Sequence, residues 1–274
     1  MLVQGDTTTV FAAALAAFYK KIKIGHVEAG LRSGNLYSPY PEEANRKLTG
    51  VISNYHFAPT ESNRQNLINE GYDEKNIFIT GNTVIDALKY SVREDFVFDD
   101  EILNDLDYNR DVVLLTAHRR ENWGKPMEDI FKAIRRVVLE KENLEIVFPR
   151  HLNPIVREAA EKYFADLDRV HLIEPLSYLP FSNLMARVKF VVTDSGGVQE
   201  EAPALGKPVL VLRNETERME GVEAKTAKLV GTKEQDVYES IVALLEDKDL
   251  YDEMAKAVNP YGDGHAAEKI VDVL

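Results

Sequence analysis

Two observations in the sequence predict an α/β protein with parallel sheets. Short runs rich in β-branched and aromatic residues alternate with amphipathic helical stretches along almost the whole chain. Some of these runs lead into Gly-Asp or Asp-Ser-Gly-Gly directly before a helical stretch begins. Because a strand, a crossover helix and a second strand form a βαβ unit, the alternation indicates parallel strands covered by helices.

The expected strands are short apolar runs bounded by polar residues, Gly or Pro. They cover residues 2–4, 23–27, 55–58, 77–80, 112–116, 145–148, 170–173, 190–193, 208–212 and 227–229. Helices are expected between them, where apolar residues recur at spacings of three and four. They cover residues 11–20, 41–52, 62–70, 84–92, 127–140, 154–165, 181–187, 197–205, 235–246 and 265–274.

The acid-rich residues 94–110 carry no clear period and are expected to form a linker or a peripheral turn. This predicts a partial Rossmann-like domain at 1–92 and a complete one at 93–258. The first is expected to be incomplete because a strand follows Met1 almost at once. A Gly- and Pro-containing break then leads to a C-terminal helix within 259–274, expected to pack back on the first domain.

Composition excludes several classes of protein. Lys plus Arg number 33 against 46 for Asp plus Glu, giving a formal charge of −13, which disfavours nucleic acid and anionic membranes as partners. The absence of cysteine excludes disulfides, thiolate metal sites and cysteine nucleophiles. The chain has neither a membrane-spanning run nor a secretion signal, so a cytoplasmic protein is expected. No pair of histidines has the H-x-x-x-H spacing of a zinc site, and no metal is expected.

Three acids are expected at neighbouring strand and helix ends of the first domain. Asp6 lies in GDTTT, Glu28 in HVEAGLR and Glu42 in PEEANR. Clustered carboxylates suit proton transfer. The alternatives are a helix N-cap for Asp6, a surface position for Glu28, and a surface ion pair between Glu42 and Arg46.

Cationic side chains are expected at strand ends of the second domain. His118 and Arg119 follow one strand, and His151 follows the next. Both residue types are suited to phosphate binding, and solvated loop charge is the alternative. His56 and His171 fall inside apolar strand patterns, which is typical of structural histidines.

The strongest local signal is DSGGVQEE, where a strand runs into a helix. Bare amides of Gly196 and Gly197 at a helix N-terminus bind anions, and Ser195 adds a hydroxyl. Glu201 is placed to accept hydrogen bonds from a ribose diol, and Arg218 to complete a sugar or phosphate pocket. A tight turn with a capping serine is the alternative. Neither G-x-G-x-x-G nor a Walker loop is present, so dehydrogenase and P-loop ATPase functions are unsupported.

These motifs resemble one known family over essentially all 274 residues. GDTTT, HVEAGLRSG, YSPYPEEANRKLTG, AHRREN, HLNP, TDSGGVQEEAPALGKPVLVLR, TER and NPYGDGHAAEKI occur in the order found in non-hydrolysing UDP-N-acetylglucosamine 2-epimerases of bacteria and archaea. The resemblance implies two Rossmann-like domains facing each other across a cleft, as in GT-B glycosyltransferases. It also implies that a family segment of about 90 N-terminal residues is missing here, so that the chain is impaired or inactive alone.

The implied reaction interconverts UDP-GlcNAc and UDP-ManNAc by anti elimination of UDP, which leaves bound 2-acetamidoglucal, and by re-addition of UDP. It needs no cofactor because no step is a redox step. A homodimer and a role in cell-surface polysaccharide synthesis are also implied. The catalytic residues would be Asp6, Glu28, Glu42 and His118, and the substrate-binding residues Arg46, Arg119, His151, Ser195, Gly196, Gly197, Glu201 and Arg218.

Three alternatives remain at this stage. A hydrolysing epimerase would release ManNAc and UDP. A catalytically impaired UDP-binding fragment would bind nucleotide without turnover. A GT-B glycosyltransferase would leave the three acids and their motifs unexplained.

Overall fold

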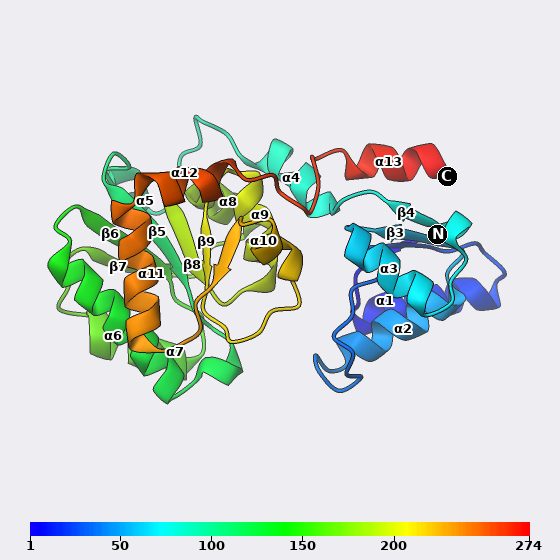
Figure 1. Ribbon diagram of the computed structural model, residues 1–274, viewed down its shortest axis with the longest axis horizontal. Coiled ribbons are helices and arrows are strands. Elements are labelled where there is room, and N and C mark those ends of the chain that lie inside the picture. The colour runs from blue at the N-terminus through cyan, green and yellow to red at the C-terminus, as the bar shows by residue number, and fades with distance from the viewer. The chain divides into compact units, whose positions relative to one another are not determined.

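The computed structural model describes all 274 residues, which divide into two compact units. The first unit comprises Met1–Ala87 and Pro260–Leu274, and the second comprises Leu88–Asn259. Each unit contains one sheet of parallel strands with helices packed on it (Figure 1). The predicted α/β class is therefore confirmed. None of the helices combines the length and the apolar character that crossing a membrane requires.

The first unit has a four-stranded sheet whose spatial order follows the chain. Its register aligns Val3 with His26, and His26 with His56. The strands are β1 (Leu2–Gln4), β2 (Gly25–Val27), β3 (Tyr55–Ala58) and β4 (Ile77–Ile79).

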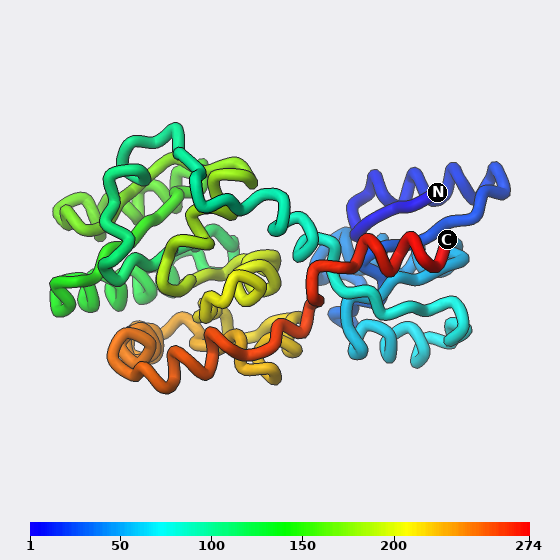
Figure 2. Tube along the Cα trace, turned by 90° about the horizontal axis from the view of Figure 1, so that it is seen from above, coloured from blue at the N-terminus to red at the C-terminus, as the bar shows by residue number.

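Helices of the first unit cover both faces of this sheet. One face packs against α1 (Thr8–Tyr19), α2 (Glu42–Ile52) and α3 (Glu61–Asn69), through clusters that include Val3 and Ala58. The other face carries α13 (Ala266–Val273), whose Ile270 packs on Val27 and Phe57. Side chains alternate across a strand, so Phe57 and Ala58 face opposite helices. Figure 2 shows α13, in red, beside the blue and cyan segments of this unit.

A buried carboxylate anchors α13 to this unit. Asp86 on α4 (Thr83–Ser91) accepts hydrogen bonds from the backbone amides of Ala266, at 3.1 Å, and Ala267, at 2.8 Å. A negative charge at a helix N-terminus also interacts favourably with the helix dipole. The boundary between the units falls inside α4, because Leu88 on the same helix belongs to the core of the second unit.

The second unit has a six-stranded sheet in the order β10-β9-β8-β5-β6-β7. Numbered within the unit, this is the doubly wound order 3-2-1-4-5-6 read from the other edge. The direction of winding reverses between β5 and β8, and ligands bind at such a switch point, beyond the strands' carboxyl ends. The strands are β5 (Asp111–Thr116), β6 (Leu144–Pro149), β7 (Val170–Ile173), β8 (Phe190–Thr193), β9 (Val209–Val211) and β10 (Ala227–Leu229).

Two hydrophobic clusters cover the two faces of this sheet. The larger one includes Phe131, Phe148 and Phe164, whose rings contact one another. It packs α6 (Lys125–Glu140), α7 (Pro154–Phe164), α11 (Glu234–Glu246) and α12 (Lys248–Lys256) on the sheet. The second cluster packs α5 (Glu101–Asp105), α8 (Tyr178–Arg187) and α9 (Gly196–Ala204). Short elements complete the chain: α10 (Met219–Glu223) and the 3₁₀ turns η1 (Glu74–Asn76) and η2 (Arg120–Asn122).

The expectation of a linker at 94–110 is wrong. Phe98 and Leu103 in this segment are buried in the core of the second unit, and residues 101–105 form α5. The apolar residues of this segment lie among many acids and follow no regular period. For that reason the sequence pattern is typical of a solvated loop. Helices α10 and α12 were also not expected from the sequence.

Candidate active site

The switch point of the second unit lies between Thr116, which ends β5, and Thr193, which ends β8. Their hydroxyl oxygens are 2.5 Å apart, and both residues are buried. The chain then continues into His118 and Arg119 on one side and into Asp194 and Ser195 on the other. The two strongest sequence signals of this unit are therefore brought together, although they are far apart in the chain.

Asp194 ties these two strand ends together. Its side chain is fully buried, and Oδ2 accepts hydrogen bonds from the backbone amides of His118 and Arg119, each at 2.9 Å. The side-chain amide of Asn122 donates to the same oxygen at 3.1 Å, and His118 Nδ1 lies 3.0 Å from Oδ1. Burial alone would raise the pKa of Asp194, but the contacts with His118 and these amides hold it below its usual range.

The Ser195–Gly197 turn starts α9 at the switch point. Ser195 occupies the N-cap position, but its side chain makes no capping hydrogen bond, so the capping-serine alternative is wrong. Gly196 and Gly197 are the first residues of the helix, where backbone N–H groups lack intrahelical partners. Ser195 and Gly197 line a cavity, so the hydroxyl and the helix N-terminus are placed to bind an anion.

Arg218 packs directly on this turn. A Cβ on Gly196 would lie only 2.6 Å from Nη1 of Arg218, so the guanidinium occupies the space that a side chain would need. Nε of Arg218 donates to Glu200 at 2.5 Å, and Nη1 donates to Glu217 at 2.6 Å. Burial would raise the pKa of Glu217, but Arg218 and Arg213 lower it to about 2. Arg218 is thus a fixed positive charge beside the turn.

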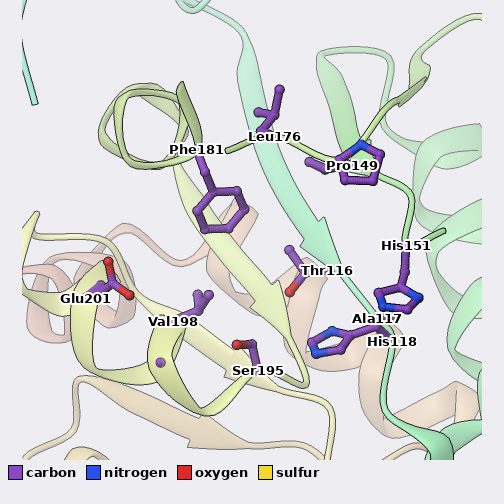
Figure 3. Close-up of a pocket in the computed structure, with 12 residues that line it drawn as sticks. Thr116, Ala117, His118, Pro149, His151, Leu176, Phe181, Ser195, Val198 and Glu201 are labelled. Carbon is purple, nitrogen blue, oxygen red and sulfur yellow. The ribbon is translucent and has the colours of Figure 1, made fainter. Parts of the chain in front are cut away.

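The cavity at the switch point has a volume of about 340 Å³. Figure 3 shows that His118, Ser195 and Glu201 line it together with the apolar Phe181 and Leu176. The imidazoles of His118 and His151 are stacked, with ring centroids 5.7 Å apart. One side of the cavity is therefore polar, with the two histidines and Ser195, and another is apolar. Its remaining lining residues are Thr116, Ala117, Pro149, Pro175, Gly197 and Val198.

Glu201 lies on α9, and one oxygen of its carboxyl is buried without a hydrogen-bond partner. Burial is the main reason why the pKa of Glu201 is raised to about 7, and nearby Glu200 adds to it. Burial and Glu201 together raise the pKa of Tyr178 to about 12. A carboxyl oxygen that is buried without a partner on a cavity wall is suited to a ligand with hydroxyl groups.

In the first unit, Asp6 follows β1 and is bound by Arg46 of α2. Nε and Nη2 of Arg46 both contact Oδ2 of Asp6 at 2.8 Å, and Nη1 contacts Glu43 at 3.1 Å. The N-cap of α1 is Thr7 rather than Asp6. Arg46 pairs with Asp6 and Glu43, and not with Glu42. The two alternatives, a helix N-cap at Asp6 and a surface ion pair between Glu42 and Arg46, are therefore wrong. Glu42 lies in the first turn of the same helix, one turn before Arg46.

Glu28 follows β2 at the same edge of the sheet. Its backbone has a φ of 66°, which lies in the left-handed region that non-glycine residues rarely adopt. The direction of its side chain is therefore set by this backbone conformation. Its Oε2 atom lies 3.6 Å from the place where a Cβ of Gly5 would be. Glu28 is therefore close to the residue that precedes Asp6, as the strand pairing predicts. Neighbouring His26 is buried, with Nε2 at 2.9 Å from the carbonyl oxygen of Gly5.

Sequence reasoning missed three residues that organise these sites. Asp194 was seen only as part of a glycine turn. Glu43 is fully buried and accepts hydrogen bonds from the amides of Ser33 and Gly34, while the Asn45 side chain donates to the carbonyl of Asp6 at 2.9 Å. The i, i+3 spacing of Glu43 and Arg46 is the one signal that could have indicated their ion pair.

An open doubly wound sheet with a glycine turn at a helix N-terminus and a mixed polar and apolar cavity at its switch point is typical of nucleotide-binding α/β enzymes. A family model described as UDP-N-acetylglucosamine 2-epimerase matches residues 1–274. The chain therefore belongs to the UDP-N-acetylglucosamine 2-epimerase family, and the family resemblance is confirmed.

Individual relatives agree with this assignment. The UDP-N-acetylglucosamine 2-epimerase of Bacillus subtilis is 58% identical over 274 residues, which is all of this chain and 71% of that protein. The structure of S. aureus MnaA with UDP is 53% identical, with a TM-score of 0.92 over 98% of this chain and 73% of that one. The Neisseria meningitidis UDP-GlcNAc 2-epimerase bound to UDP-GlcNAc is 49% identical, with a TM-score of 0.90 over 99% and 75% of the two chains.

Proposed function

We propose that the chain catalyses the reversible, non-hydrolytic epimerisation of UDP-GlcNAc at C2. A base removes the C2 proton, the C–H electron pair forms a C1=C2 double bond, and UDP leaves with the C1–O electron pair. UDP then attacks C1 of the bound 2-acetamidoglucal while C2 receives a proton on the opposite face. C1 and C2 are the only sugar carbons whose bonds change, and the reaction needs no oxidant or reductant.

Proton transfer is assigned to Asp6, Glu28 and Glu42. The observation that carries the proposal is the clamping of Asp6 by Arg46, because both contacts go to one carboxylate oxygen, Oδ2. That geometry leaves Oδ1 outside the clamp and fixes its direction, as a group that exchanges a proton with a bound substrate requires. A base and an acid are needed on two faces of C2, and the neighbouring Glu28 and Glu42 supply further carboxyl groups.

Nucleotide binding is assigned to the second unit. The amides of Gly196 and Gly197, the Ser195 hydroxyl and the Arg218 guanidinium would stabilise the diphosphate, whose negative charge grows as the C1–O bond breaks. His118, Arg119 and His151 would contribute further donors to the diphosphate, and Glu201 would accept the ribose hydroxyls. The buried, unpartnered carboxyl oxygen of Glu201 supports that last assignment.

The test is proton NMR of UDP-GlcNAc incubated with the purified chain in deuterium oxide. The proposal expects UDP-ManNAc with deuterium at C2, together with deuterium in recovered UDP-GlcNAc. Free ManNAc and UDP as the initial products would instead establish a hydrolysing epimerase. UDP binding without any exchange at C2 would reduce the chain to a nucleotide-binding protein.

A homodimeric state is also proposed, and it is supported only by the family resemblance. Light scattering coupled to size-exclusion chromatography measures it directly. A mass near 31.0 kDa would indicate a monomer and would contradict this part of the proposal.

A further inference from the structure

Glu43, the second residue of α2, carries a carboxylate that is fully buried. Its Oε2 atom accepts hydrogen bonds from Nη1 of Arg46 and from the backbone amide of Ser33, each at 3.1 Å. The amide of Gly34 donates to Oε1 at 3.3 Å. The buried charge is therefore held by a cation one turn further along the same helix and by two amides of the loop that precedes the helix.

This carboxylate is connected to all three acids to which proton transfer is assigned. Nε and Nη2 of Arg46 contact Oδ2 of Asp6 at 2.8 Å each, so Arg46 joins it to Asp6. The two loop amides lie between Glu28 and Glu42 in the chain, and Glu42 is its direct neighbour at the start of α2. It therefore joins the end of β1, the loop before α2 and α2 itself.

Stability alone does not account for a charge at this position. Burying an ion pair removes hydration that the attraction between the charges barely replaces, and apolar residues of similar volume are often as stable or more so. The pair does supply a fixed geometry, because the guanidinium of Arg46 is planar and all three of its nitrogens are bound. It cannot rotate about its Nε–Cζ bond without breaking the contacts of Nη1 with Glu43 and of Nη2 with Asp6.

We propose that Glu43 is a positioning residue, which holds the guanidinium of Arg46 in the orientation that fixes the Asp6 carboxylate for proton transfer. The proposal rests on the proposed function, in which Asp6 exchanges a proton with the substrate. The side chain of Glu43 is fully buried, so it acts through Arg46 and not on the substrate itself. Its loss is expected to impair the step at C2 and to spare UDP binding, which is assigned to the second unit.

The first experiment compares turnover with nucleotide binding in Glu43→Gln, which keeps the shape of the side chain and removes its charge. Proton NMR gives kcat and KM for UDP-GlcNAc, and calorimetry gives the affinity for UDP. The value of kcat is expected to fall about ten-fold or more, because a small misplacement of a reacting group costs rate steeply. UDP affinity is expected to stay unchanged. An unchanged kcat, or an equal loss of kcat and UDP affinity, would overturn the proposal.

The matched control is Glu61→Gln on α3. Glu61 and Arg64 form an ion pair of the same i, i+3 spacing in the same unit, at 2.9 Å, but the Glu61 side chain is 63% exposed. This variant is expected to keep the kcat and the UDP affinity of the wild type. An equal loss of kcat in Glu43→Gln and Glu61→Gln would contradict the proposal, because the effect would then follow from the change in charge and not from its position.

A double-mutant cycle with Arg46→Lys tests whether the effect passes through the guanidinium. If Glu43 acts through Arg46, then Glu43→Gln causes little further loss of kcat in the Arg46→Lys background. Fully additive losses would contradict the proposal.

A measurement on the ligand-free chain separates this proposal from the proposed function. Nitrogen-15 NMR of the arginine guanidinium groups, with the Arg46 signals assigned by their disappearance in Arg46→Lys, measures rotation about the Nε–Cζ bond. Rotation is expected to be slow in the wild type and faster in Glu43→Gln, because the contact with Nη1 loses its charge. Equal rates in the two chains would overturn the proposal. If the wild-type chain shows no turnover, the proposed function fails, whereas the rotation rates still decide whether Glu43 holds Arg46.

Discussion

Two buried histidines are expected to make the first unit sensitive to acid. His26 and His56 are neighbours in register on β2 and β3, and both are almost fully buried. Burial lowers the pKa of His26 to about 4, although the carbonyl of Gly5 opposes the shift. Burial, with the added effect of His26 and Arg32, lowers the pKa of His56 to about 4.

The sign and size of the effect follow from proton linkage. In the unfolded chain each histidine binds a proton below a pKa of 6.5, but in the folded unit only below about 4. The unfolded state therefore binds more protons between these values, and the free energy of unfolding falls as the pH falls from 6.5 towards 4. Each histidine is expected to cost about 2 kcal/mol at pH 5, at about 1.4 kcal/mol per pH unit.

The assay is urea denaturation at pH 7.5 and pH 5.0, with hydrogen exchange of the β2 and β3 amides as the local readout. The single tryptophan, Trp123, lies in the second unit, so its fluorescence reports that unit in the same sample. Between pH 7.5 and pH 5.0, the free energy of unfolding obtained from exchange in the first unit is expected to fall by more than the free energy of unfolding that Trp123 reports for the second unit.

Variants then assign the effect. His56→Phe keeps an aromatic ring beside Tyr72, whose centroid is 4.7 Å away, and removes the unpartnered Nδ1 atom. Its pH dependence in the first unit is expected to weaken by about 2 kcal/mol between the two pH values. The control His265→Gln removes an exposed histidine of the same unit and is expected to change nothing. Equal pH dependence in wild type and His56→Phe would refute the reasoning.

Three further predictions concern the two sites and the C-terminal helix. Gly196→Ala places a methyl group against the guanidinium of Arg218, which Glu200 and Glu217 hold in place. UDP affinity, measured by calorimetry, is therefore expected to fall roughly ten-fold. An unchanged affinity would show that Arg218 is free to move. Because the pKa of Glu201 is about 7 and a ribose diol donates to the ionised form, UDP affinity is expected to rise between pH 6 and pH 8. A Glu201→Gln chain that keeps the same rise would exclude Glu201 as its cause. Asp86→Asn removes the negative charge from the N-terminus of α13. It is expected to destabilise the first unit by about 1 kcal/mol in urea titrations and to speed up amide exchange in α13. Wild-type exchange rates in α13 of this variant would show that Ile270 alone holds the helix.

Sequence by itself determined the α/β class and the course of most elements. Each predicted strand overlaps an observed one, because short β-branched runs bounded by turn residues are a local signal. The glycine turn at Gly196 was also local, since a bare amide at a helix start is visible in the chain order. Residues 94–110 escaped this reasoning because their burial depends on apolar surface contributed by other parts of the chain.

Tertiary structure alone decided which charged groups meet. Asp6 and Arg46 are 40 residues apart, and His118 and Asp194 are 76 apart. No local spacing rule links such pairs. The order of the strands brings them together, because parallel strands place their carboxyl ends at one edge of a sheet and the winding reverses between β5 and β8. The residue types at the sites were therefore readable from the sequence, whereas their partners, their burial and the resulting pKa shifts arose only when the sheets formed.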